Sequence, residues 1–201
     1  MQRPDEKKRK QIVAAAVKLF AARPFHEVRL EDVASAAHVG KGTVYIYFDS
    51  KEELYASLVR EAFVALVDRL APQLATPVNG RAATAPSSWD GLKLVVKELV
   101  EFSAANPHFF RLMRAGLPGH NDRALIAKRQ ELGHMLEGCI RRGVRRGEMS
   151  DPHPELTAQF IPGLVRAASL WGPEEMSPDV VVNHILRLLE QGLAPRKGRT
   201  S

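Results

Sequence analysis

The stretch LEDVASAAHVGKGTVYIYFDSKEELY, residues 30–55, decides how the rest of the chain is interpreted. Its apolar residues recur every three or four positions, which is the spacing of one helix face and not the alternation of a strand. The segment HVG, residues 38–40, separates two such runs. The stretch therefore predicts two short helices, at about Leu30–Ala37 and from about Lys41, joined by a tight turn. The residues expected to pack the two helices together are Val33, Ala34, Ala37, Val39, Val44 and Phe48.

Gly40, Lys41, Gly42 and Thr43 could alternatively end a phosphate-binding loop. That loop requires Gly, four residues and then Gly-Lys-Ser/Thr, placed directly after a buried strand. With Gly40 and Lys41 aligned, Ser35 stands at the first glycine and Gly42 stands where the magnesium-binding hydroxyl belongs. A helix precedes the loop instead of a strand. The sequence therefore excludes a nucleotide-binding loop at this place.

The second short helix carries hydrogen-bond donors on the side away from its apolar residues. Lys41, Thr43, Tyr45 and Tyr47 offer N–H and O–H groups suited to the phosphate oxygens and base edges of DNA. An ordinary helical corner, whose tyrosines and lysine only meet solvent, is the structural alternative. The two short helices with outward donors favour a helix-turn-helix that binds DNA.

The composition agrees with an anionic partner without specifying one. The chain has 201 residues, of which 45% are hydrophobic, and it carries a formal net charge of +6 with a sequence pI near 9.7. Such a balance favours nucleic acid or a membrane surface. Basic residues also gather at Arg141–Arg146, where they could bind an anion or lie in solvent at a helix C-terminus. With no apolar signal core and no run long enough to span a bilayer, the sequence predicts a soluble, cytoplasmic protein with no membrane partner.

Helical spacing continues along the rest of the chain, so we expect an all-α fold of about nine helices. The first helix should end before Pro24, which cannot continue it. Ser50 and Glu53 form a capping box that should start a long helix, and this helix should end before Pro72. Further helices are expected at about 89–105, 123–146, 154–171 and 178–193, with a short aromatic helix around Phe109 and Phe110.

One segment of the chain is set apart by its composition. Residues 76–88 are rich in Pro, Ala, Ser and Gly, which is typical of a loop. The predicted organisation is a DNA-binding domain at 1–50, a ligand-binding and dimerisation domain at 51–195, and a basic tail at 196–201. The helix from residue 51 should connect the two domains.

Residues that could support catalysis or bind a metal are not grouped in the sequence. The seven histidines show no i, i+3 or i, i+4 pairing, and no H-E-x-x-H, G-x-S-x-G or dinucleotide motif occurs. The single cysteine, Cys139, stands at a core-facing position of a helix, so we expect a buried structural thiol and not a nucleophile. The sequence predicts no enzyme, no catalytic residue, no metal site and no cofactor.

The larger half is expected to hold a ligand pocket. The helix break at Asn106–Pro107 and the turn at Pro118–Gly119 leave a short aromatic helix among longer ones, a shape that often leaves space between helices. Plain core packing of the same side chains is the alternative. The candidate lining consists of Phe102, Phe109, Phe110, Met113, Met135, Cys139, Phe160 and Trp171.

The last two helices carry small and branched residues on adjacent faces, which favours close packing against a symmetry mate in a four-helix interface. The alternative is that these faces only close the protein's own core. The candidate interface consists of Leu156, Phe160, Gly163, Leu164, Ala167, Ala168, Val181, Ile185, Leu188 and Leu189.

Residues 30–55 resemble the DNA-binding signature of the TetR family of transcriptional repressors. The alanines, the valine, Gly-Thr, Tyr, Phe and the Ser-Lys-Glu-Glu-Leu cap fall in register, and the close match covers about residues 8–55. The resemblance implies a homodimer that binds a palindromic double-stranded DNA operator and is released by a small-molecule effector. It also implies that the larger half holds the effector site and the dimer interface. It places the groove contacts on Lys41, Gly42 and Thr43 and the phosphate contacts on Thr43, Tyr45, Tyr47 and Lys51.

Three positions depart from the family's usual residues. Arg29 stands where Ser or Thr caps the first helix of the motif, and its side chain, which cannot cap, could reach a phosphate instead. His38 replaces a turn glycine, so a left-handed backbone there would be strained. Gly40 replaces a common serine, which costs little at an N-cap. Two other functions stay open: an activator or nucleoid-organising protein on the same scaffold, and a small-molecule-binding or catalytic helical protein.

Overall fold

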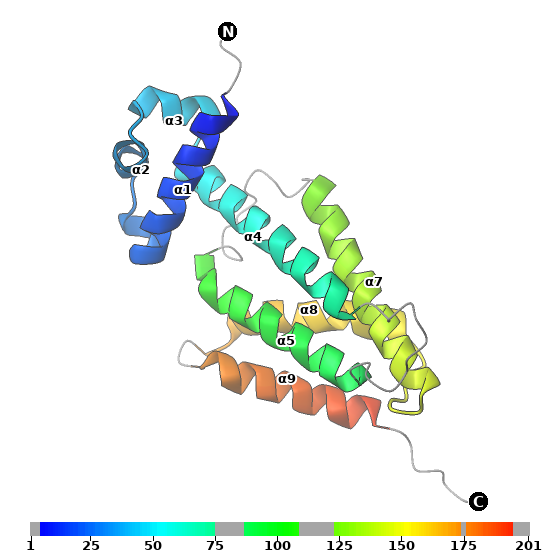
Figure 1. Cartoon of the computed structure of the whole chain (residues 1–201). Helices are drawn as coiled ribbons and strands as arrows, with labels where there is room; N and C mark the ends of the chain where they lie inside the picture. Colours follow the sequence, from blue (N-terminus) through cyan, green and yellow to red (C-terminus); the bar gives the residue numbers. More distant parts are fainter. Residues whose placement is uncertain (1–4, 75–86, 109–122, 174–175, 195–201) are drawn as a thin grey trace, which may run out of the picture. The chain divides into compact units, whose positions relative to one another are not determined.

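The computed structural model of the chain describes residues 5–74, 87–108, 123–173 and 176–194. Within these ranges the protein is all-helical, with eight α-helices, one short 3-10 turn at Phe25–Glu27 and no strand (Figure 1). This confirms the predicted all-α class, and the short helix expected around Phe109 lies outside the described residues. The α-helices are α1 (Glu6–Ala22), α2 (Leu30–Ala36), α3 (Lys41–Tyr47), α4 (Lys51–Leu74), α5 (Ser88–Ala105), α7 (Arg123–Arg145), α8 (Pro154–Trp171) and α9 (Pro178–Leu193).

The helices form two compact units. The first unit runs to Ala62 and includes His108, and the second takes in Phe63–Pro107 and the chain from Arg123 onward. The division falls inside α4, whose first half belongs to one unit and whose second half belongs to the other. The predicted domain boundary, after residue 50, coincides instead with the start of this helix.

Local capping explains where α1 begins and ends. The Asp5 carboxylate accepts a hydrogen bond from the Lys7 amide at 2.9 Å, which satisfies one of the unpaired N–H groups of the first turn. The helix ends at Ala22 because Arg23 precedes Pro24 and adopts extended backbone. The predicted stop before Pro24 is confirmed.

The start of α4 also follows from its cap, but its end does not follow from its proline. The Ser50 hydroxyl accepts from the Glu53 amide at 3.1 Å, while the Glu53 carboxylate accepts from the Asp49 amide at 2.7 Å. The expectation that α4 ends before Pro72 is wrong, because the helix continues through Pro72 to Leu74. This close to the helix end, the ring removes a single backbone donor, and its fixed φ suits a helix.

The first unit is held together by an apolar core beneath α1, α2 and α3. As predicted, the two short helices meet through Val33, Ala34, Ala37, Val44 and Phe48, all of them buried. Val39, in the turn, is half-buried against the same core. The other buried members of this core are Ile12, Ala15, Ala16, Val28, Leu30 and Leu54.

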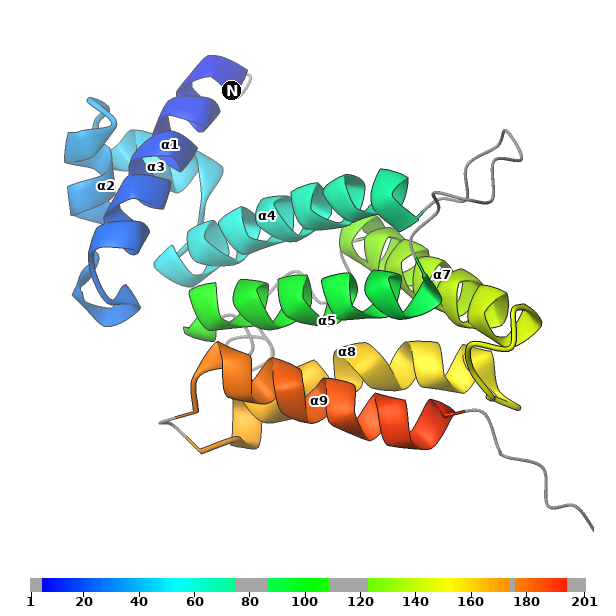
Figure 2. The same cartoon turned by 60° about the horizontal axis from the view of Figure 1, so that its bottom comes forward.

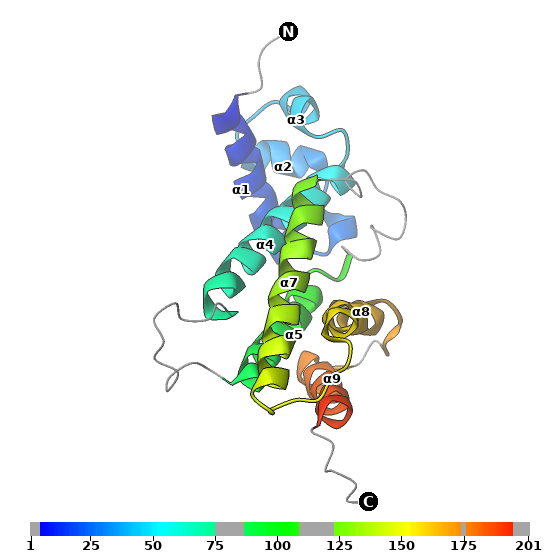
Figure 3. The same ribbon diagram turned by 90° about the vertical axis from the view of Figure 1, so that its right-hand side faces the viewer.

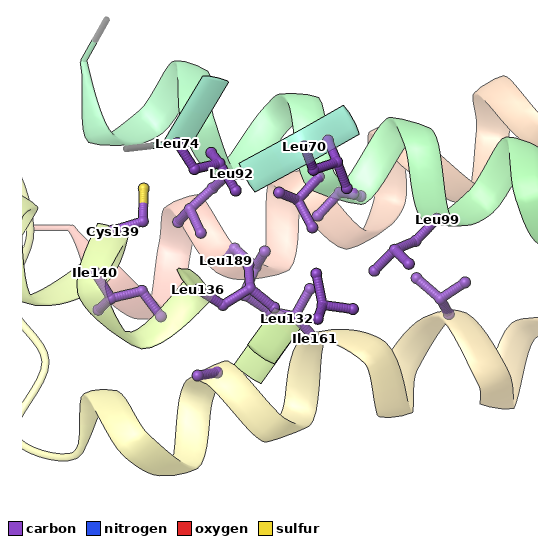
Figure 4. Close-up of a cluster of buried hydrophobic side chains, with 14 of the residues drawn as sticks. Leu70, Leu74, Leu92, Leu99, Leu132, Leu136, Cys139, Ile140, Ile161 and Leu189 are labelled. Atoms are coloured by element: carbon purple, nitrogen blue, oxygen red, sulfur yellow. The ribbon is translucent and has the colours of Figure 1, made fainter. Parts of the chain in front are cut away.

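In the second unit α5 lies against α7, α8 and α9 (Figure 2). Helices α8 and α9 also lie against each other, and Figure 3 shows them side by side. The core between these helices and the second half of α4 is almost entirely aliphatic (Figure 4). Its labelled members are Leu70, Leu74, Leu92, Leu99, Leu132, Leu136, Cys139, Ile140, Ile161 and Leu189.

Small residues allow α5 and α7 to approach closely. A Cβ added at Gly91 on α5 would lie 2.9 Å from the Cys139 sulfur on α7, and one added at Gly143 on α7 would lie 3.0 Å from the Ser88 Cβ on α5. The Cys139 thiol donates to the Ser88 carbonyl at 3.2 Å. Burial raises the pKa of this thiol, so it stays protonated at neutral pH. The predicted buried structural thiol is confirmed.

None of the helices in the described part of the chain is both long and apolar enough to cross a membrane.

Candidate nucleic-acid interface

The turn between α2 and α3 fixes how the second helix is presented. The Val39 amide donates to the Ala34 carbonyl at 3.0 Å and the His38 amide donates to the Ser35 carbonyl at 3.1 Å, which closes the end of α2. His38 has a φ of 52°, in the left-handed region where glycine is favoured. The strain expected from the missing turn glycine is therefore present. Gly40, at the N-cap of α3, has ordinary extended backbone.

The start of α2 is capped without help from the Arg29 side chain. A guanidinium has only donors, so it cannot accept a hydrogen bond from the helix N–H groups. The Asp32 carboxylate instead accepts from the Arg29 amide at 3.1 Å. The Arg29 side chain is exposed, and its contact with a DNA phosphate stays a prediction.

Lys41 is held in place by a neighbour on α2. Its ammonium lies 2.5 Å from a Glu31 carboxylate oxygen and 5.9 Å from the centre of the Tyr45 ring. The hydrogen bond to Lys41 lowers the pKa of Glu31, and the same bond raises the pKa of Lys41. Both groups are charged at neutral pH. In the absence of DNA, the exposed Lys41 charge is thus balanced within the helix-turn-helix.

The two tyrosines of α3 have different environments. Tyr45 is 44% exposed, in agreement with its predicted outward position. The Tyr47 hydroxyl accepts a hydrogen bond from the Asp5 amide at 2.8 Å and donates one to the Asp5 carbonyl at 3.1 Å. Tyr47 therefore ties α3 to the start of α1. A phosphate oxygen only accepts, so a phosphate contact by Tyr47 would need its single O–H donor and would displace the hydrogen bond to the Asp5 carbonyl.

Lys51 is half-buried at the start of α4 and contacts Phe25. Its ammonium donates to the Phe25 carbonyl at 2.8 Å and lies 4.3 Å from the centre of the Phe25 ring. The same ring packs against Phe20, Tyr55 and His108, at centroid distances between 5.1 and 5.8 Å. An ammonium carries three N–H donors, so donors remain for a phosphate oxygen after the Phe25 carbonyl takes one. Phe25 was not recognised from the sequence because 26 residues separate it from Lys51.

The exposed side of α3 also contains a residue that was not among the predicted DNA contacts. Ile46 is 63% exposed, while Val44 on the same helix is fully buried. A Cβ added at Gly42 would meet nothing within 4 Å, so a side chain there would project from the helix. Ile46 comes two residues after the core-facing Val44 and therefore lies on the opposite side of the helix, so its exposure could have been predicted from the sequence.

The predicted pocket-lining residues are not gathered in one place in the described part of the chain. Phe102 is half-buried beside Phe63, with ring centroids 5.7 Å apart, and Met135 is half-buried against the core. Cys139 is fully packed in that core. On α8, Phe160 is 61% exposed and Trp171 is 68% exposed. Phe109, Phe110 and Met113 lie outside the described residues, so the predicted pocket stays a prediction.

The predicted interface residues divide into an outer set and an inner set. Ile185 and Leu189 are buried in the core of the second unit, so their side chains are not available to a partner. Leu164 and Val181 are half-buried and pack against that core, and Ala167 and Ala168 are half-buried. The exposed members are Leu156, Phe160, Gly163 and Leu188.

The basic run on α7 is used within the protein. Arg141 pairs with Glu137 at 2.7 Å and with Glu155 at 3.3 Å. Arg142 donates to the Leu74 carbonyl at 2.8 Å, which satisfies a terminal carbonyl of α4. Arg146 lies 3.6 Å from Glu148. Intramolecular contacts therefore explain these three arginines without an anionic ligand.

A helix-turn-helix with cationic and hydroxyl side chains on its outer helix, followed by a larger helical unit, defines a DNA-binding regulator with a separate C-terminal domain. Residues 12–58 match the bacterial regulatory proteins of the tetR family, and residues 85–193 match the tetracyclin repressor-like C-terminal domain. The chain belongs to the TetR family. It is a DNA-binding transcriptional regulator and not an enzyme.

Relatives and solved structures of this family resemble the whole chain. The fatty acid metabolism regulator protein of Bacillus subtilis (strain 168) is 25% identical over 194 residues, which cover 91% of this chain and 94% of that protein. A transcriptional regulator of the TetR/AcrR family from Thermobifida fusca superposes with a TM-score of 0.72 at 23% identity, covering 94% of this chain and 98% of the other. FadR from Bacillus subtilis, in complex with stearoyl-CoA, superposes with a TM-score of 0.62 at 22% identity, covering 91% and 98%.

Proposed function

We propose that this protein is a transcriptional repressor that binds a palindromic operator as a homodimer and is released by a small-molecule effector. The observation that carries the proposal is the outer surface of α3. On this surface Lys41 and Tyr45 are exposed, Thr43 is half-buried, and a Cβ added at Gly42 would meet no atom within 4 Å. On the opposite side of the helix, the buried Val44 and Phe48 pack into the core. A rigid helix with outward donors is what insertion into a major groove requires.

The proposed contacts fall into two groups. Lys41 and Thr43 are near the start of α3, where a recognition helix meets base edges, and a lysine there suits the O6 and N7 acceptors of guanine. Tyr45, Tyr47 and Lys51 would bind phosphates beside the groove, with Arg29 as a further candidate at the start of α2. Phosphate contacts supply affinity and orientation, and base contacts supply the sequence preference.

The proposed dimer uses the outer surface of α8 and α9. Phe160 and Leu156 are exposed one turn apart on α8, and Leu188 is exposed on α9. Gly163, on α8, would allow close approach because a Cβ there would meet nothing within 4 Å. Exposed apolar side chains that lie next to one another favour an association surface. A dimer also fits a palindrome, since its two-fold axis repeats each contact in both half-sites.

The dimer is tested by substituting a charge at the centre of this surface. Phe160→Asp should convert the dimer to a monomer in analytical ultracentrifugation and should weaken operator binding, while leaving the helical content unchanged. Ile126→Asp provides a matched control, because Ile126 is an exposed residue of α7 outside the proposed surface. A Phe160→Asp protein that remains dimeric would place the interface elsewhere.

The effector is proposed to bind in the C-terminal unit. The curated relative named a fatty acid metabolism regulator and the FadR complex with stearoyl-CoA make long-chain acyl-CoA the first class to test. The experiment is calorimetric titration of the purified protein with stearoyl-CoA, with free coenzyme A as the control. Binding that also releases operator DNA would support an acyl thioester as effector. Binding without release would argue against induction by this class.

The central experiment is selection of bound duplexes from a random library by the purified full-length chain, followed by selection from fragments of the genome. We expect a palindromic consensus and a few sites that overlap promoters. Many sites spread across the genome would favour a nucleoid-organising protein, and sites upstream of promoters that are activated would favour an activator. No enrichment of any duplex at low salt would contradict specific DNA binding.

A further inference from the structure

Ile46 is a large apolar side chain on the proposed DNA-binding helix for which the contacts above give no role. It is 63% exposed, whereas Val44 is fully buried. Two residues of an α-helix are about 200° apart around its axis, so Ile46 lies on the side of α3 that faces away from the core. Gly42 precedes Val44 by two residues and therefore lies on that same side, one turn before Ile46.

The surface beside Ile46 is open. Side chains on a helix lean toward its N-terminus, so Ile46 covers part of the turn that contains Gly42. A Cβ added at Gly42 would meet no atom within 4 Å, which leaves room next to the isoleucine. Isoleucine is β-branched and holds one preferred χ1 rotamer in a helix, so little side-chain freedom is lost when it makes a contact. Ile46 and Gly42 thus form the outermost line of α3, where a rigid apolar side chain stands beside a position that has no side chain.

This arrangement suits one chemical feature of the major groove. The residues flanking the line, Lys41, Thr43 and Tyr45, carry polar groups for phosphates and polar base edges. The outermost line itself would face the floor of the groove, where the one apolar group on any base edge is the C5-methyl of thymine. A polar base edge placed against Ile46 would lose water without gaining a hydrogen bond.

We propose that Ile46 contacts the C5-methyl group of a thymine in each half-site and thereby selects thymine at that position. The inference rests on the proposed operator binding and adds a specificity-determining residue to it. Gly42 has a supporting role, because a side chain there would fill the space that the methyl group needs.

The test combines a change in the DNA with a change in the protein. Each thymine of the selected operator is replaced in turn by deoxyuridine, which pairs identically and lacks only the methyl group. At one thymine of each half-site the wild-type chain should lose about fourfold in affinity, the value expected for one buried methyl group. Ile46→Ala should bind the unmodified operator less tightly by at least that factor and should show no further loss on replacement by deoxyuridine.

Ile126→Ala is the matched control, because it shortens an exposed isoleucine on α7, in the other unit. It should keep the wild-type sensitivity to deoxyuridine. A wild-type protein that is insensitive at every thymine, or an Ile46→Ala protein that keeps the full sensitivity, would overturn the role of Ile46 while leaving operator binding intact. Ile46→Ala that changes the oligomeric state but not the affinity for DNA would also overturn it, in favour of a protein contact. Failure of the wild-type chain to select any operator would overturn both proposals.

Discussion

A substitution at Lys51 can separate a contact with DNA phosphate from a structural contact with Phe25. Its ammonium is bound to the Phe25 carbonyl at 2.8 Å and lies 4.3 Å from the Phe25 ring centre. We expect this ammonium also to neutralise one phosphate in each half-site. Lys51→Met removes the charge and keeps an unbranched side chain that can still pack on the ring. The two roles then predict two measurable losses.

The phosphate role sets the expected change in salt dependence. Each neutralised phosphate contributes about 0.9 to the slope of log affinity against log salt, and a symmetric dimer presents Lys51 twice. The slope should therefore become shallower by about 1.8. Between about 50 and 200 mM salt, the wild type should lose roughly tenfold more affinity than Lys51→Met loses. Because phosphates carry no sequence information, operator and scrambled duplex should weaken by similar factors.

The structural role sets the expected change in stability. A hydrogen bond from a charged donor and a cation–π contact are both removed, and Lys51 is half-buried, so the free energy of unfolding should fall by about 1–2 kcal/mol. Thermal unfolding measures this loss, and binding is then compared at a temperature where both proteins are folded. The matched control is Lys97→Met, which removes an exposed lysine of α5, in the second unit. The Lys97 ammonium lies 3.7 Å from a carboxylate oxygen of Glu101 on the same helix.

The expected change in salt slope and the expected loss of stability can be contradicted independently of each other. An unchanged salt slope together with reduced stability would mean that Lys51 only positions Phe25. A loss of affinity confined to the operator would mean that Lys51 reads a base. Either result would refute the phosphate contact, whereas a Lys97→Met protein with the same reduced slope would show that net charge alone is responsible.

Three further predictions concern other parts of the protein. Thr43→Ala and Tyr45→Phe should each weaken operator binding by about 1–3 kcal/mol at fixed salt without changing helical content, and unchanged affinity in both would remove them from the interface. Gly91→Ala should lower the free energy of unfolding by about 1–3 kcal/mol because its Cβ would lie 2.9 Å from the Cys139 sulfur, and Gly91→Ala in a Cys139→Ala background should cost less if that contact is the cause. Burial raises the pKa of Tyr55, so the phenol ionises at a lower pH in the unfolded chain than in the folded one, and stability should be lost as pH rises above about 10. Tyr55→Phe should lose less stability than the wild type over this range in thermal unfolding, and an identical pH dependence would exclude Tyr55 as its source.

Elements governed by local chemistry could be predicted from the sequence. The stop at Pro24 and the cap at Ser50 depend on neighbouring residues, and the packing of Val44 against α2 depends on a short-range helical period. The end of α4 could not be predicted in this way. Pro72 lies near the helix end, where burial of Leu74 and the hydrogen bond from Arg142 to the Leu74 carbonyl stabilise the last turn.

The site was less predictable because its side chains are held by residues far away in the chain. Tyr47 is bonded to Asp5, 42 positions earlier, and Lys51 is bonded to Phe25. Nothing in a helical period indicates such partners. Similarly, α9 has apolar residues on more than one side, and its packing against α5 and α8 decides that Leu189 is buried while Leu188 is exposed.

The most direct test of the helix-turn-helix assignment is chemical protection of the selected operator by the bound protein. Dimethyl sulfate methylates guanine N7, which lies in the major groove, and adenine N3, which lies in the minor groove. With α3 in the major groove, guanines in both half-sites should be protected at N7, in two patches about one helical turn or a multiple of it apart. Protection of adenine N3 alone, or one continuous patch without two-fold symmetry, would contradict a dimer that reads the major groove through Lys41 and Thr43.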